Sequence, residues 1–103
     1  MPDILGYARV STGDQDVAGQ EMRLNKAGAI RTFTDVISGK SMERPGLAEL
    51  IAFARDGDTL AVVRLDRLGR SLGELLSTVK MLKERGIELL SLEEKIDTTS
   101  AAG

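Results

Sequence analysis

Residues 4–14 read ILGYARVSTGD, and the interpretation of the whole chain begins from this stretch. The apolar run at 4–10 predicts a first strand, and the Gly-Asp pair at 13–14 breaks that pattern before a polar helical segment. Ser11 is therefore expected at a turn from strand to helix. In open α/β sheets ligands bind at this edge, because strand ends and helix N-termini bring unpaired N–H groups together there.

Arg9 and Ser11 are two residues apart on the predicted strand, so their side chains share a face if the strand reaches the serine. A guanidinium and a hydroxyl on one face can address the same phosphate. A structural interpretation is also open. A serine before a helix is most often an N-cap, and Asp14 stands where a capping box prefers Glu or Gln. Arg9 would then be an exposed strand residue paired with an acid, and this stretch alone favours that interpretation.

Composition narrows the possible chemistry. The chain has 103 residues, 42% hydrophobic and 29% charged, which is typical of one small folded domain. Cysteine and histidine are absent, which excludes disulfides, thiol chemistry and an imidazole base and argues against a zinc site. The formal net charge of −2 argues against strong non-specific DNA binding, so any contact with nucleic acid must come from a local cluster of arginines.

Nothing in the sequence predicts contact with a membrane. No apolar run approaches the length of a membrane span, and the N-terminal residues 1–3 lack the basic segment of a signal peptide. We therefore expect a cytoplasmic protein.

Strands and helices are expected to alternate along the chain. After the first strand, helices are predicted at 15–27, 45–57 and 72–85, and strands at 30–36, 59–65 and 87–92. Pro45 suits the first turn of the second helix, and a capping box from Ser71 to Glu74 opens the third. Alternation implies right-handed βαβ units. The predicted fold is a three-layer α/β/α domain with a mainly parallel central sheet.

The sequence Gly39-Lys40-Ser41 looks like the end of a phosphate-binding P-loop. A P-loop needs a glycine five positions before Gly39, and Thr34 occupies that position. The match fails, and a glycine-containing loop is the better interpretation.

A second motif, RLDRLGR at 64–70, directly follows the third predicted strand. Its arginines are expected at the sheet edge that also carries Arg9 and Ser11, and Arg44 in the preceding loop can join them. Arginine suits phosphate oxygens because its planar fork donates two parallel hydrogen bonds and keeps its charge. Such a cluster can offset the charge of a phosphodiester under attack without a metal. The alternative is a solvated loop in which Asp66 neutralises one arginine, which is less plausible for three arginines than for one.

Four motifs together resemble the catalytic domain of the serine recombinases, the resolvase and DNA invertase family. They are GYARVST at 6–12, ERPGL at 43–47, LDRLGR at 65–70 and IDT at 96–98. The match runs along the whole chain in the right order. The combination is specific, although each motif alone is not.

This resemblance implies roles for individual residues. Ser11 corresponds to the nucleophile that attacks a DNA phosphodiester, leaving a 5′-phosphoserine link and a free 3′-hydroxyl. Arg9, Arg67 and Arg70 correspond to the arginines that bind the scissile phosphate, and Asp66 to an acid that handles the leaving oxygen or orients an arginine. Further residues in or around the site are Tyr7 and Arg44, counted as catalytic, and Gln15, Gln20, Asp35 and Ser38, counted as substrate-binding. The phosphoserine conserves the bond energy, so no cofactor, ATP, metal or small-molecule substrate is implied.

Members of this family continue with a long oligomerisation helix and a helix-turn-helix domain. We therefore expect residues 1–103 to be a catalytic domain truncated before these parts and inactive alone. The full-length protein is expected to act on prokaryotic DNA at the nucleoid, as a homodimer that assembles to a tetramer. An alternative is a non-catalytic domain that pairs with a full-length partner through apolar surface near 96–103. A flavodoxin-like phosphate-binding module is disfavoured because no glycine-rich fingerprint follows the first strand.

Overall fold

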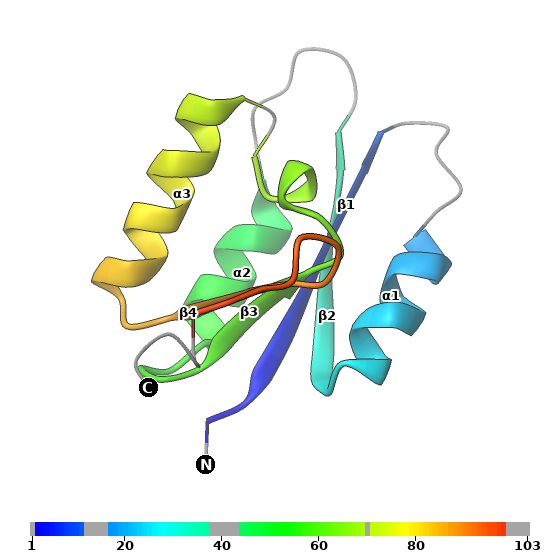
Figure 1. The fold of residues 1–103 in the computed structure, drawn as a ribbon, viewed down its shortest axis with the longest axis horizontal. Coiled ribbons are helices and arrows are strands. Elements are labelled where there is room, and N and C mark those ends of the chain that lie inside the picture. Colours follow the sequence, from blue (N-terminus) through cyan, green and yellow to red (C-terminus); the bar gives the residue numbers. More distant parts are fainter. Residues whose placement is uncertain (1, 12–16, 38–43, 70, 99–103) are drawn as a thin grey trace.

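The computed structural model describes residues 2–11, 17–37, 44–69 and 71–98. Strands and helices alternate along most of the chain, as the sequence predicts (Figure 1). The elements are β1 (Ile4–Ser11), α1 (Val17–Lys26), β2 (Ala29–Ile37), α2 (Pro45–Phe53), β3 (Thr59–Val62), the 3-10 turn η1 (Leu65–Arg67), α3 (Leu72–Glu84), β4 (Glu88–Ser91) and β5 (Ile96–Asp97).

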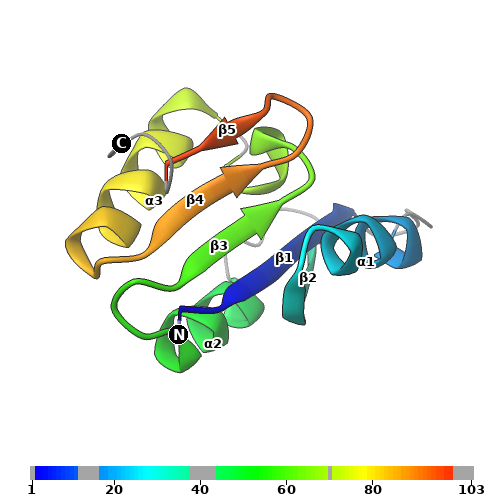
Figure 2. The ribbon, with the colours of Figure 1, turned by 60° about the horizontal axis from the view of Figure 1, so that its bottom comes forward.

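The five strands form one sheet in the order β2-β1-β3-β4-β5 (Figure 2). Every neighbouring pair is parallel except β4 and β5. The chain leaves β1 for β2 on one side and then returns to β3 on the other side. This reversal is a topological switch point, and α/β proteins bind ligands outside the carboxyl ends of the strands that flank it. In this fold those strands are β1 and β3.

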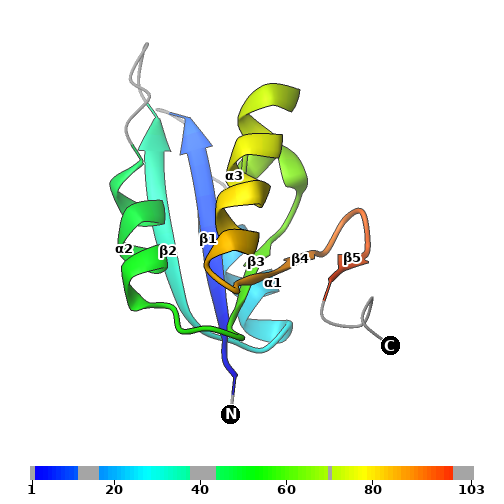
Figure 3. The ribbon, with the colours of Figure 1, turned by 90° about the vertical axis from the view of Figure 1, so that its left-hand side faces the viewer.

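Helices cover both faces of the sheet, so the predicted three-layer α/β/α architecture is confirmed. Helices α2 and α3 pack on the same side, and α1 packs on the opposite side (Figure 1). Strands β1 and β2 run side by side to the same end of the molecule (Figure 3). The N-terminal end of α3 lies at that end too (Figure 1).

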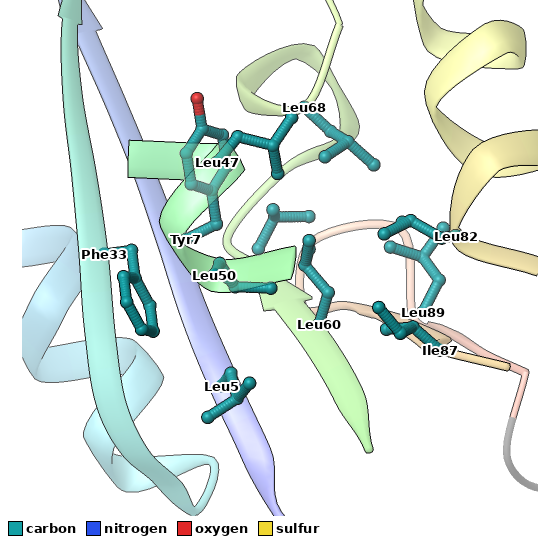
Figure 4. Packing of buried hydrophobic residues seen from close by; sticks show 11 residues of the cluster. Leu5, Tyr7, Phe33, Leu47, Leu50, Leu60, Leu68, Leu82, Ile87 and Leu89 are labelled. Carbon is teal, nitrogen blue, oxygen red and sulfur yellow. The ribbon is translucent and has the colours of Figure 1, made fainter. Parts of the chain in front are cut away.

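The larger core lies between the sheet and the α2–α3 layer (Figure 4). Leu5 and Tyr7 of β1 pack there, and both are fully buried. Side chains alternate along a strand, so Arg9 belongs to this same face. Gly6 belongs to the other face, where an added Cβ would lie 3.1 Å from the Cδ1 of Leu24 on α1. The glycine of the first motif thus allows α1 to pack close to β1.

Two predicted boundaries in the described residues are wrong by more than one residue. Helix α2 ends at Phe53 rather than near Gly57, because Asp58 accepts the Arg55 N–H at 2.9 Å and holds a non-helical turn. Strand β3 ends at Val62 rather than residue 65, because η1 begins at Leu65.

The short antiparallel strand β5 was not predicted from the sequence. Thr98 supports it, since its hydroxyl accepts the Leu89 N–H at 2.8 Å. Residues 15–16, placed by prediction at the start of the first helix, lie outside the described residues.

Candidate active site

β1 keeps its strand geometry through Ser11, whose backbone pairs in register with Ile37 of β2. Arg9 and Ser11 therefore take alternate positions of one strand, at its carboxyl end beside the switch point. The Ser11 side chain and residues 12–16, with the predicted site residue Gln15, lie outside the described part of the chain.

Arg9 is buried, with 4% of its surface exposed. Its Nη1 donates a hydrogen bond to Oε1 of Glu74 on α3 at 3.1 Å, and the two side chains form an ion pair. The Nη1 of Arg67 donates to the backbone carbonyl of Arg9 at 3.2 Å. Removing one partner of such a buried ion pair costs about 3–5 kcal/mol because it leaves the other charge buried and uncompensated, so Arg9 depends on Glu74. Arg9 is paired with an acid, but it is not the exposed residue that the structural interpretation requires.

Arg44 precedes α2 and reaches into the same region. Its Nη1 lies 4.0 Å from Oε1 of Glu74 and donates to the hydroxyl of Thr78 at 3.4 Å. Its Nη2 donates to the carbonyl of Leu68, and its guanidinium carbon lies 5.7 Å from the centroid of the Tyr7 ring. Arg44 therefore connects α2, α3 and the segment after η1, and it shares one carboxylate oxygen with Arg9.

Tyr7 and Asp35 form a buried support below Arg44. The Tyr7 hydroxyl donates to Oδ2 of Asp35 at 2.7 Å. Asp35 also accepts the backbone N–H groups of Gly46 at 2.6 Å and Leu47 at 3.0 Å, so it caps the N-terminus of α2 from the neighbouring strand. Burial, and then the hydrogen bond to Asp35, raise the pKa of the Tyr7 hydroxyl far above its usual value. Both residues are engaged in holding the fold of the site.

The ERPGL motif explains how α2 can begin at this place. Pro45 fits the first helical turn, where its missing N–H leaves no hydrogen bond unmade. Gly46 lies so close to β2 that a Cβ would stand 2.5 Å from the carbonyl oxygen of Thr34. Only a glycine lets α2 approach the strand closely enough for Asp35 to cap it.

The η1 turn carries Asp66 and Arg67 of the second motif, and Arg64 directly precedes it. Asp66 is exposed, and its Oδ1 lies 3.5 Å from Nε of Arg64 and 3.9 Å from Nε of Arg67. Exposed pairs of this kind contribute about 0–1 kcal/mol, so Asp66 stays available to a ligand. Part of the motif is self-paired, as the structural alternative expects. Arg70 lies outside the described residues.

Of the remaining predicted site residues, the structure describes only Gln20, and it is not part of this cluster. Gln20 lies on α1, which covers the sheet face opposite to Arg9. It is 1% exposed, and its side-chain amide has no hydrogen-bond partner among the described residues. Ser38 falls outside the part of the chain that the structure describes.

Two acids that sequence reasoning did not assign to the site have a clear place in it. Glu74 was interpreted only as the last residue of a capping box; the Ser71 hydroxyl does accept its N–H at 3.1 Å, but its carboxylate reaches Arg9. Glu94 accepts the hydroxyl of Ser91 and the N–H of Leu65 at 3.3 Å, so it ties the turn after β4 to η1. The Ser91 hydroxyl, followed by other donors, lowers the pKa of Glu94. No sequence spacing signals the contact of Glu74 with Arg9 or that of Glu94 with Leu65, because these partners are far apart in the chain.

The described residues also lack the features of a metal centre and of a membrane-spanning helix. They contain no group of three or more acidic, histidine or cysteine residues that could hold a metal ion. None of the helices formed by these residues combines the length and apolar character needed to cross a membrane.

Fold and site together define a doubly wound α/β protein with arginines gathered at the switch point of its sheet. Residues 4–103 match the family described as the resolvase N-terminal domain, and the chain belongs to this family of resolvases and DNA invertases.

Relatives of known name agree with this assignment. A transposon resolvase of Staphylococcus aureus is 52% identical over 101 residues, covering 96% of this chain and 51% of the relative. A DNA invertase of Salmonella typhimurium is 48% identical over 99 residues, covering 96% and 52%. This chain thus spans about half the length of these relatives.

Solved structures show the same fold. A resolvase family site-specific recombinase from Streptococcus pneumoniae superposes with a TM-score of 0.76 at 21% identity, covering 96% of this chain and 77% of the other. A serine recombinase from Sulfolobus solfataricus gives a TM-score of 0.67 at 27% identity, covering 92% and 74%.

Proposed function

We propose that this chain is the catalytic domain of a site-specific DNA recombinase that cuts and rejoins DNA through a covalent 5′-phosphoserine intermediate. The observation that carries the proposal is the convergence at one sheet edge. Strand β1 ends with Arg9 and Ser11 at alternate positions, and Arg67 of η1 contacts the Arg9 carbonyl. Arg44, directly before α2, shares the Glu74 carboxylate with Arg9.

In this proposal Ser11 is the nucleophile. The Ser11 hydroxyl gives up its proton as its oxygen attacks the phosphorus of a phosphodiester. The bond from phosphorus to the 3′-oxygen breaks, and the leaving oxygen takes up a proton to become a free 3′-hydroxyl, so no net proton is gained or lost. The 5′-phosphate stays bonded to the serine. The reverse attack by a 3′-hydroxyl restores the phosphodiester and the serine, so the exchange needs no ATP and no metal. This is covalent catalysis by a hydroxyl that its electrostatic surroundings must activate.

The arginines supply that electrostatic environment. Arg9, Arg67, Arg70 and Arg44 neutralise the phosphate oxygens, whose charge changes most in the transition state. Asp66 is exposed and close to Arg67, which suits it to orient that guanidinium or to exchange a proton with the leaving oxygen. Tyr7 and Asp35 act indirectly, because they hold the start of α2 and therefore Arg44. Gln15 and Ser38 are proposed to line the path of the DNA strand, whereas Gln20, buried on the opposite face of the sheet, is proposed to act only through the packing of α1.

The complete protein is proposed to contain more than residues 1–103. Relatives of twice this length support a following segment, which we propose to be the oligomerisation helix and a helix-turn-helix DNA-binding domain. The full protein would act as a dimer that assembles to a tetramer on prokaryotic DNA at the nucleoid, in the cytoplasm. Residues 1–103 alone would lack the contacts for sequence-specific strand exchange.

The test is a covalent-adduct assay. The chain is fused to a DNA-binding domain of known site and mixed with a nicked suicide substrate, in which the cleaved end diffuses away. A denaturing gel is expected to show a protein–DNA adduct with the native sequence and with Ser77→Ala, an exposed serine on α3. The adduct is expected to vanish with Ser11→Ala. If DNA binding is confirmed but no adduct forms, the result would favour a non-catalytic role.

One observation favours that second role. Leu72 and Leu76, one turn apart on α3, are 72% and 59% exposed. The same helix also contributes Val79 and Leu82 to an apolar pocket of about 440 Å³. An exposed apolar surface of this kind is typical of a docking face for another protein. In the second role the chain would pair with a full-length recombinase without cutting DNA, and Ser11 would be only the last residue of β1.

A further inference from the structure

Glu74 lies between two of the arginines that the proposed function assigns to the phosphate. Its Oε1 is 3.1 Å from Nη1 of Arg9 and 4.0 Å from Nη1 of Arg44. The side chains of Arg9, Arg44 and Glu74 are 4%, 13% and 18% exposed. One carboxylate oxygen therefore balances two largely buried cations. A phosphate oxygen carries the same sign of charge and accepts the same guanidinium hydrogen bonds.

The backbone of Glu74 is fixed independently of its carboxylate. The hydroxyl of Ser71 accepts its N–H at 3.1 Å, and its carbonyl accepts the hydroxyl of Thr78 at 2.9 Å. The Thr78 hydroxyl in turn accepts a hydrogen bond from Nη1 of Arg44 at 3.4 Å. Changing the carboxylate to an amide consequently leaves the helix cap and the Thr78 bridge in place. The charge of Glu74 can be tested without dismantling the start of α3.

A phosphate that approaches Arg9 meets a guanidinium that already has a partner. The phosphate must displace the carboxylate or share the cations with it, and two anions close together on the same cations repel each other. Without the carboxylate, Arg9 would be a buried charge with its ion-pair partner missing, which is strongly unfavourable in the free protein. The carboxylate thus stabilises the free protein and opposes phosphate binding for the same reason.

We propose that Glu74 holds the place of the DNA phosphate in the free protein and sets the affinity of the Arg9–Arg44 pair for phosphate. Glu74 is a positioning residue. It keeps both guanidinium groups at the sheet edge until a phosphodiester replaces its carboxylate as their anionic partner. The inference rests on the proposed function, because it takes Arg9 and Arg44 as phosphate ligands.

The test compares phosphate binding by the native chain, Glu74→Gln and a matched control, Glu84→Gln. Glu84 is an exposed glutamate on the same helix, so both variants lose one negative charge. Thermal unfolding is followed with increasing inorganic phosphate at constant ionic strength. A ligand that binds the folded state raises the unfolding temperature according to its concentration and Kd.

We expect Glu74→Gln to unfold at a lower temperature than the native chain without phosphate and to gain far more stability when phosphate is added. The expected gain in phosphate affinity is about tenfold or more over the native chain. Glu84→Gln is expected to behave like the native chain. Adding Arg9→Gln to Glu74→Gln is expected to remove the gain, because the cation that binds the phosphate is gone.

A second variant covers the case in which Glu74→Gln does not fold. Glu74→Asp keeps the charge but shortens the reach to Arg9, so its phosphate affinity is expected to lie above that of the native chain. The inference is overturned if the folded variants bind phosphate no more tightly than the native chain does. It is also overturned if Glu84→Gln gives the same gain, because general charge would then be the cause.

Phosphate binding does not involve the Ser11 hydroxyl in bond formation, so this experiment is separate from the adduct assay. A tighter phosphate site in Glu74→Gln without any DNA adduct would leave the inference standing and remove the recombinase chemistry. An adduct at Ser11 together with an unchanged phosphate affinity would support the recombinase chemistry and overturn the inference about Glu74.

Discussion

At the scale of single residues, buried polar side chains near the sheet edge join neighbouring strands and helices through hydrogen bonds. One carboxylate, Asp35, joins three elements: it receives the hydroxyl of Tyr7 on β1 and two N–H groups at the start of α2, while belonging itself to β2. Buried polar groups are tolerated when each has its partner, and losing one partner leaves the other exposed to the full desolvation penalty. Such residues are therefore sensitive probes of the fold.

Tyr7 gives a clean spectroscopic test, because it is the only tyrosine and tryptophan is absent. Its raised pKa means that the folded chain keeps the phenol neutral where an unfolded chain ionises, at about pH 10. Stability is then lost as pH rises above the unfolded value. Tyrosinate absorbance is expected to appear together with loss of the circular dichroism signal. The control is the denatured chain, in which the Tyr7 phenol is expected to ionise near pH 10. Ionisation of Tyr7 near pH 10 while the chain is still folded would contradict the structure.

Asp58 gives a test on the acid side. Burial works against its charged form, but the N–H groups of Asp3 and Arg55 outweigh burial and hold the pKa of Asp58 below its usual range. A depressed pKa contributes stability that is present above the unfolded value of about 3.9 and is lost as pH falls through the folded value. Asp58→Asn is expected to lower the free energy of unfolding by about 1.5–3 kcal/mol at neutral pH, and by less in acid.

Urea unfolding at neutral and acid pH measures this difference. Asp56→Asn is the matched control, because Asp56 is an exposed neighbour, and little change is expected there. A deficit of Asp58→Asn that stays the same in acid would show that its carboxylate charge is not what stabilises the turn.

At the scale of elements, helix placement depends on glycines that the motifs supply. Gly46 lets α2 begin against β2, and Gly69 lets the segment after η1 lie against α3, where a Cβ would stand 2.6 Å from Cα of Leu75. A glycine is needed at both positions because another part of the backbone lies too close for a Cβ, and not because the residue has a positive φ. The two helices they admit carry Arg44 and Glu74 to Arg9, so local packing and the site are linked.

Gly46→Ala is expected to destabilise the chain by about 1–3 kcal/mol, because the added methyl overpacks the contact with β2. The control is Gly73→Ala in α3, where an added Cβ meets nothing within 4 Å. That change is expected to stabilise the chain by at most about 0.5 kcal/mol, since Gly73 lies in the first turn of α3, where the helical preference for alanine over glycine is only partly felt. Urea unfolding measures both changes. Equal effects of the two substitutions would contradict the close approach of α2 to β2.

At the scale of the whole molecule, the sequence predicted the alternation of elements and the three-layer architecture, because apolar periodicity reports which faces are buried. It did not predict the strand order or β5. Strand order depends on how separate βαβ units pack, and β5 is only two residues long.

The site was predictable to a similar degree. Motifs placed Arg9 and Arg44 near each other, as the structure finds. The role of Glu74 was missed because its partner Arg9 is 65 residues away, and a capping box already explained its position. Asp35 was predicted in or around the site, but only the fold shows that three hydrogen bonds occupy its carboxylate.

The central claim is that Ser11 forms the covalent bond to DNA, and mass spectrometry of the adduct tests it most directly. The protein–DNA adduct is digested with nuclease and trypsin, and the peptide of residues 10–23 is fragmented. We expect a nucleotide joined through its 5′-phosphate to Ser11, and not to the adjacent Thr12, while the released strand carries a free 3′-hydroxyl. A nucleotide on another residue, or an adduct joined through a 3′-phosphate, would contradict the proposed mechanism.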